Sequence, residues 1–120
     1  MREFLLVALG GALGASGRFG VNLIAPWSGA GVPWATLMVN VIGGAAMGAL
    51  FAVAADNRPL MLLLGVGVLG GFTTFSAFSI ETVRLLQRGD AATAVIYIAL
   101  SVTLSIAAAF AGHAIARSVA

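Results

Sequence analysis

Long runs of apolar residues alternate with short polar interruptions along the whole chain. Four runs come close to the ~20 residues that a helix needs to cross ~30 Å of hydrocarbon, and they cover approximately residues 4–24, 34–55, 60–86 and 92–117. Gly, Pro, Asp and Asn gather in the connections at 25–33, 56–59 and 88–90. The pattern predicts an all-α integral membrane protein, with residues 1–120 forming a single four-helix transmembrane domain.

The third run is interrupted between Gly70 and Glu81 by glycine, four hydroxyls and three phenylalanines. The apolar stretches on its two sides are similar in length, so we expect a helix broken near the bilayer midplane. A first half-helix ending near Gly70 would leave carbonyls free, while a second beginning between Thr73 and Ser76 would leave amides free. One break therefore offers a cation site and an anion site close together.

Hydroxyl groups recur at four-residue spacing on the fourth run, at Thr93, Tyr97, Ser101 and Ser105. Such residues share one helix face. Serine often bonds back to its own helix, but four hydroxyls on one face exceed that need. The stripe favours a polar path.

Two shorter polar stripes lie on the first and second runs. Arg18 follows Gly14 by four residues and either snorkels to the interface or forms a positive vestibule that attracts anions. Asn40 follows Thr36 by four residues and lies deep enough that its amide needs a partner, by default an interhelical hydrogen bond.

Phe75 and Phe78 are three residues apart on one face of the second half-helix. Core packing is the usual meaning of such a pair, although positive ring edges turned into a pore would favour an anion. Glu81 precedes Arg84 by three residues, and we expect an ion pair between them.

Small residues at small-xxx-small spacing indicate close helix packing, within the chain or between copies. They are Gly10 with Gly14, Gly44 with Gly48, and Ala107 with Ala111.

Composition supports the membrane assignment, since 61% of the residues are hydrophobic and 8% charged, against roughly 25% charged in soluble domains. The arginines are scattered, which suits lipid headgroups and argues against nucleic acid. Cysteine is absent, which excludes thiolate metal sites. His113 is the only histidine, the GxGxxG pattern at 65–70 lies inside a span, and no nucleophile, base and acid converge. We therefore expect no enzyme.

Arginine balances across the membrane. Four spans place both termini and the turn at 56–59 on one side, with Arg2, Arg58 and Arg117, and leave Arg18, Arg84 and Arg88 on the other. Three against three gives the positive-inside rule nothing to act on. Either a subtler signal sets the orientation, or the protein inserts both ways and pairs with its inverted copy; the paired breaks could then share one cation through backbone oxygens.

At these residues the sequence resembles the CrcB/Fluc family of fluoride channels. The similarity spans the chain and is carried by the segments 10–15, 18–19, 36–40, 43–44 and 70–81 and by the spaced Tyr97, Ser101 and Ser105. The run Gly-Gly-Phe-Thr-Thr-Phe-Ser-x-Phe-Ser-x-Glu is its most specific part. Ala77 and Ala35 stand where the family often has Thr and Gly.

The resemblance implies a dual-topology antiparallel homodimer with two antiparallel pores, in the inner or plasma membrane of a prokaryote. It would passively export fluoride from the cytoplasm and so protect against fluoride toxicity. Phe75 and Phe78 would line each pore, while Asn40, Tyr97, Ser101 and Ser105 would serve the dehydrated ion. Gly70 and Thr73 would give backbone carbonyls to a central, structural sodium ion, and Arg18 would belong to an electropositive vestibule.

Two other functions fit a small four-span protein. A dual-topology multidrug or cation exporter needs a membrane-embedded acid, whereas all four acids lie near predicted helix ends. A non-transporting assembly subunit would leave the Thr, Ser and Phe stripes unexplained.

Overall fold

The computed structural model describes residues 1–120 as an entirely helical chain. Its elements are α1 (Arg2–Ile24), α2 (Trp34–Ala54), α3 (Arg58–Leu60), the π-helix η1 (Met61–Leu69), α4 (Gly70–Phe72), α5 (Phe75–Gln87) and α6 (Ala91–Val119). Four helical spans, the third running from Arg58 to Gln87, are long and apolar enough to cross a membrane. The four predicted spans are thereby confirmed, with ends within two residues of those expected.

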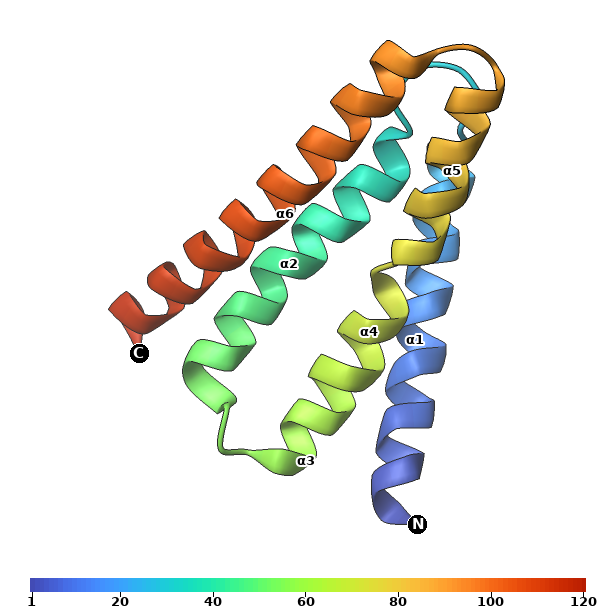
Figure 1. Cartoon of the computed structure of the whole chain (residues 1–120). Helices are drawn as coiled ribbons and strands as arrows, with labels where there is room; N and C mark the ends of the chain where they lie inside the picture. Colours follow the sequence, from blue (N-terminus) through green and yellow to red (C-terminus); the bar gives the residue numbers. More distant parts are fainter.

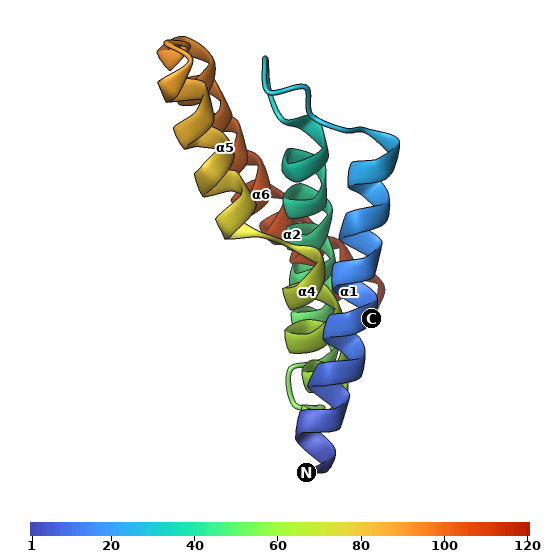
Figure 2. The same ribbon diagram turned by 90° about the vertical axis from the view of Figure 1, so that its right-hand side faces the viewer.

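The four spans form two pairs. α2 packs along α6, and α1 packs against the lower half of the third span, while α5 leans away from α1 towards α6 (Figures 1 and 2). Both termini lie towards the same end of the molecule as the turn between α2 and α3 (Figure 1). This arrangement places the α1–α2 loop and the α5–α6 turn together at the opposite end.

The third span is broken near its middle, as the sequence predicts. Helical structure continues through η1 and α4 to Phe72, and Thr73 and Thr74 are extended, with ψ of 157° and 114°. The break therefore falls two residues later than Gly70, the expected end of the first half-helix. Nine residues of π-helix precede it, a form that no sequence pattern indicated and that is often found at functional sites.

Glycines bring the helix backbones into direct contact within the chain. A Cβ atom at Gly10 or Gly14 would overlap the backbone of η1, and one at Gly48 would overlap the Ala109 carbonyl of α6. At Gly44 it would stand 2.8 Å from the Ser105 carbonyl oxygen. These small-residue pairs are used in intramolecular packing, whereas Ala107 and Ala111 remain exposed.

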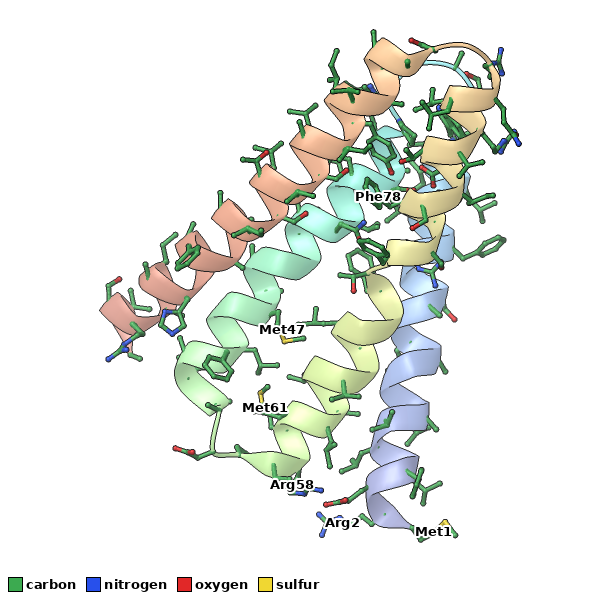
Figure 3. All side chains as sticks on the ribbon, viewed as in Figure 1. Met1, Arg2, Met47, Arg58, Met61 and Phe78 are labelled. Carbon is green, nitrogen blue, oxygen red and sulfur yellow. The ribbon has the colours of Figure 1, made fainter.

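Polar groups fix the helix ends. The Glu3 carboxylate accepts two hydrogen bonds from the Arg58 guanidinium, at 2.5 and 2.9 Å, and joins the start of α1 to α3 (Figure 3 labels Arg58). At the other end, Asp90 caps α6 by accepting a 3.2 Å hydrogen bond from the Thr93 amide. Hydrogen bonding to Thr93, from its side chain first and from its backbone amide second, holds the pKa of Asp90 below its usual value.

Candidate functional site

A cavity of about 330 Å³ lies beside the break, where α2, α5 and α6 meet. Its lining residues are Asn40, Thr73, Thr74, Phe75, Phe78, Ser101, Val102, Ser105 and Ile106. Five of the residues expected to meet the ion, which the sequence scatters over three segments, are therefore brought to one place. A larger cavity of about 620 Å³ lies at the turn over residues 52–59, away from every polar stripe.

Asn40 holds the break in its extended form. Its side-chain Oδ1 accepts from the Thr74 amide at 2.8 Å, and its Nδ2 donates to the Thr74 carbonyl at 3.0 Å. The Thr74 hydroxyl in turn caps α5 by accepting from the Ala77 amide at 3.1 Å. Both the interhelical bond expected of Asn40 and the threonine N-cap are thus confirmed. An amide group has two N–H donors, so one donor of Asn40 remains for the cavity.

Ser101 and Ser105 are buried hydroxyls without a hydrogen-bond partner. The nearby Thr103, on the same helix, donates to the Ala99 carbonyl four residues earlier. Because a buried polar group without a partner is costly, unpartnered hydroxyls on a cavity wall indicate a site for a ligand that accepts hydrogen bonds.

Three aromatic rings form a ladder from the cavity into the core. The ring centroids of Phe75 and Phe78 are 5.3 Å apart, and those of Phe78 and Tyr97 are 5.2 Å apart, with both pairs tilted. Phe78 and Tyr97 belong to the buried core with Leu37 and Leu85, whereas Phe75 is 78% exposed. Phe78 lies between α5 and the α2–α6 pair (Figure 3), so it serves the core and the cavity wall together.

Glu81 does not form the expected ion pair with Arg84, and that prediction is wrong. Its Oε1 accepts from the Thr36 hydroxyl at 2.6 Å and its Oε2 accepts from the Tyr97 hydroxyl at 3.0 Å. The Arg84 guanidinium lies instead over the Trp27 ring, 5.0 Å from its centroid. Glu81 is therefore bonded to hydroxyls of α2 and α6 and not to the arginine three residues later in α5.

This carboxylate was missed as part of the site because we placed it near a helix end. Half-buried within α5, Glu81 is the acid most deeply embedded in the helix bundle. The available signal was positional: Thr36 is four residues before Asn40, and Tyr97 is four residues before Ser101. Both stripes therefore already run one turn past the cavity, and the side chains at that turn, Thr36 and Tyr97, are the ones that meet at Glu81.

Gly70 and Thr73, expected to bind a cation, and Arg18, expected in a vestibule, all lie at the break. Of these three residues, only Thr73 lines the cavity. Arg18 donates through Nε to the Gly71 carbonyl at 3.2 Å. The Thr74 amide, which in a continuous helix would bond the Gly70 carbonyl, is taken by Asn40. Thr93, the first residue of the hydroxyl stripe, takes part in the Asp90 cap and does not reach the cavity.

Comparison with known proteins finds a family match over most of the chain. Residues 5–113 match the family described as "CrcB-like protein, Camphor Resistance (CrcB)". The chain is 50% identical to the "Fluoride-specific ion channel FluC" of Paracoccus denitrificans over 116 residues, which are 95% of this chain and 94% of the relative. Proteins of the same name from Hyphomonas neptunium and Thermus thermophilus are 47% and 44% identical, over 99% and 94% of this chain and 98% and 94% of theirs.

Proposed function

Since the chain belongs to the CrcB family, we propose that it is a fluoride-specific ion channel, which passively exports fluoride from the cytoplasm and so protects the cell from fluoride toxicity. The family resemblance predicted from the sequence is confirmed by the match. The relatives are ion channels by name, so the family is one of channels and not of enzymes. Four apolar spans and bacterial relatives make this a multi-pass prokaryotic membrane protein.

One structural observation carries the proposal: two buried hydroxyls, on Ser101 and Ser105, have no partner and border a cavity at a helix break. Fluoride is small and strongly hydrated, so its passage requires donors that replace water without becoming a trap. The serine hydroxyls and the remaining N–H of Asn40 supply such donors. The rings of Phe75 and Phe78 add weakly positive edges that attract an anion without binding it tightly. Tyr97 lies four residues before Ser101 and would extend the row of hydroxyls beyond the cavity wall, where its own hydroxyl donates to Glu81.

The proposed channel is a dual-topology homodimer with two antiparallel pores. Support comes from the surface left open at the break, because Gly70 is exposed and its carbonyl has lost the usual helical donor. Unpaired backbone in the middle of a span is tolerated only where protein or a water-filled cavity surrounds it. A second copy, packed in the inverted orientation, would cover Gly70 and complete the cavity wall beside the exposed ring of Phe75.

The donor set at the break suits a structural sodium ion. Gly70 and Thr73 would hold it through backbone carbonyls, and unwound membrane helices bind sodium through such oxygens. Two copies related by an axis through the breaks would each contribute the same oxygens. The ion would neutralise carbonyl dipoles where two breaks meet and so hold the copies together.

Arg18 would supply the positive charge of a vestibule. Its Nε hydrogen bond to Gly71 fixes the guanidinium beside the break, and the remaining N–H donors stay free to attract anions. An arginine anchored in this way raises the local anion concentration without leaving its own position.

Replacing Phe75 with isoleucine tests the assignment. We expect Phe75→Ile to reduce fluoride efflux from proteoliposomes strongly, by at least about tenfold, while leaving the dimer assembled, because Ile lacks the positive ring edge. A fluoride electrode measures the efflux, with chloride-loaded vesicles as a specificity control. Phe4→Ile is the matched variant, since Phe4 is 79% exposed at the start of α1, far from the cavity. Unchanged efflux in Phe75→Ile would contradict the role of that ring.

The exporter remains the competing function, and Glu81 is the observation that favours it. A half-buried acid bonded to Thr36 and Tyr97 could couple transport to protons. Fluoride efflux that needs no proton gradient excludes that coupling, and efflux of any kind excludes a non-transporting subunit. A drug-stimulated proton flux without fluoride efflux would support the exporter.

A further inference from the structure

Arg84 and Arg88, at the end of α5, converge on one point of the α1–α2 loop. A Cβ atom at Gly29 would stand 2.9 Å from Nη1 of Arg88 and 3.5 Å from Nη2 of Arg84. Gly29 itself is buried and has φ of +91°, a conformation that suits glycine. Two guanidinium groups thus meet over a backbone position that carries no side chain.

Neither arginine forms a salt bridge with a carboxylate. The one salt bridge of the chain joins Arg58 to Glu3 at the other end of the molecule. Glu81 is bonded to Thr36 and Tyr97, and Asp90 caps α6. Both acids lie near enough to attract the arginines through space, but neither lies within ion-pair distance. Convergent like charges without a counter-ion repel each other, so the arrangement calls for an external anion.

The α1–α2 loop next to these arginines lies at the expected membrane surface and is closed by its own hydrogen bonds. The Trp27 indole donates to the carbonyls of Ala30 and Gly31, both at 3.1 Å, while Arg84 stacks on its ring. A cavity of about 260 Å³ follows this loop, with Trp27 and Trp34 in its wall. Tryptophans of this kind sit at the headgroup level of a bilayer.

We propose that Arg84 and Arg88 bind the phosphate of an anionic lipid headgroup, with the loop from Trp27 to Gly31 as the floor of the site. Guanidinium forks match the oxygens of a phosphodiester, which would accept from both arginines and relieve their repulsion. The adjoining cavity, bordered by two indoles, suits the glycerol part of a lipid better than it suits a free phosphate ion. In an inverted pair each leaflet would hold one such lipid.

Native mass spectrometry of the purified protein tests the site. Protein is exchanged into mixed micelles that contain equal amounts of phosphatidylglycerol and phosphatidylcholine, and the retained lipids are counted. We expect the wild type to retain phosphatidylglycerol preferentially, and Arg84→Gln with Arg88→Gln to lose about tenfold or more of that preference, because each arginine near the surface contributes separately. Arg117→Gln, which removes an arginine from the other end of the molecule, is the matched control and should keep it.

Two further arms keep the outcome clear. Arg84→Lys with Arg88→Lys preserves the charge and should retain an intermediate preference, which shows that a folded variant responds to guanidinium geometry. Inorganic phosphate at millimolar concentration should fail to displace the lipid. Equal retention by the wild type and the glutamine variant, or full displacement by inorganic phosphate, would overturn the proposal. None of these measurements depends on fluoride transport.

Discussion

Two serines of α6 differ from the other hydroxyl residues of the spans. Thr73, Ser79, Thr82 and Thr103 each donate to the carbonyl four residues earlier, as hydroxyls in membrane helices commonly do. Ser101 and Ser105 are buried without any partner. A hydroxyl that supports the fold and a hydroxyl that serves an ion can therefore be separated by what its removal does to stability.

We predict that Ser101→Ala and Ser105→Ala lower fluoride efflux while leaving the protein as stable as the wild type, or slightly more so. A hydrogen bond to a charged group is worth about 1.5–3 kcal/mol, which corresponds to roughly tenfold to a hundredfold in rate if it is lost at the transport barrier. No protein hydrogen bond is lost, so the melting temperature in detergent should not fall. Thr103→Val, which removes an exposed hydroxyl together with its bond to the Ala99 carbonyl, should leave efflux unchanged and lower the melting temperature at most slightly. A loss of stability with normal efflux would make the serines structural.

The placement of side chains was predictable where a spacing of four puts them on one face, as for Asn40, Ser101 and Ser105, which line one cavity. It was not predictable where the partner comes from elsewhere in the chain. Glu81 was assigned to Arg84, three residues away, but its partners are Thr36 and Tyr97, which are 45 and 16 residues distant. Local spacing cannot report such a choice, because the positions of α2 and α6 relative to α5 decide it.

The broken third span is the element on which the site depends. Its existence followed from a polar run inside an apolar segment, and its Thr74 cap from the residue type preferred at a helix start. The π-helix η1 did not follow from any local pattern. Gly65 and Gly67 are buried in it, and Gly67 lies against Gly10 of α1. The close approach of two backbones is a tertiary contact that propensity does not encode.

We predict that Asn40→Ala destabilises the break. The change leaves the Thr74 amide and carbonyl without their partner inside a span, at a cost of roughly 1–3 kcal/mol for each group. The melting temperature and the fraction of dimer should both fall, together with efflux. Asn22→Ala is the control, because the Asn22 amide only adds a second bond to the Arg18 carbonyl of its own helix. Equal melting of the two variants would show that Asn40 does not hold the break.

At the scale of the whole molecule, the chain is a flat, open bundle with extents of 46, 33 and 21 Å, and little of it is closed to the outside. Only 19 of the 120 residues are buried, among them Thr74 and Ser101 of the cavity wall, while Gly70 at the break lies exposed. Lipid suits the exposed leucines and valines but not the exposed break. The proposed partner copy would cover the break, and the balanced arginines are compatible with its inverted orientation.

We predict dual orientation, and the absence of native cysteine makes it measurable with single substitutions. Asp56→Cys in the α2–α3 turn and Gln87→Cys at the end of α5 lie at opposite ends of the molecule and are both exposed. A membrane-impermeant maleimide applied to intact cells should label each variant to about half of the level reached after permeabilisation, because three arginines on each side give no preference. Complete labelling of one position and none of the other would establish a single orientation.

Adding lysines to one end of the molecule tests whether fluoride efflux requires both orientations. Val119→Lys with Ala120→Lys adds positive charge at the terminal end, and Ala25→Lys with Gln87→Lys adds it at the opposite end, so each pair should force one orientation. If inverted pairing builds the pores, either variant alone should lose most fluoride efflux from cells, since copies of one orientation cannot meet break to break. Co-expression of the two should restore efflux towards the wild-type level. Full efflux from a variant that is labelled from one side only would show that a single orientation suffices, and would remove the inverted axis from the proposed channel.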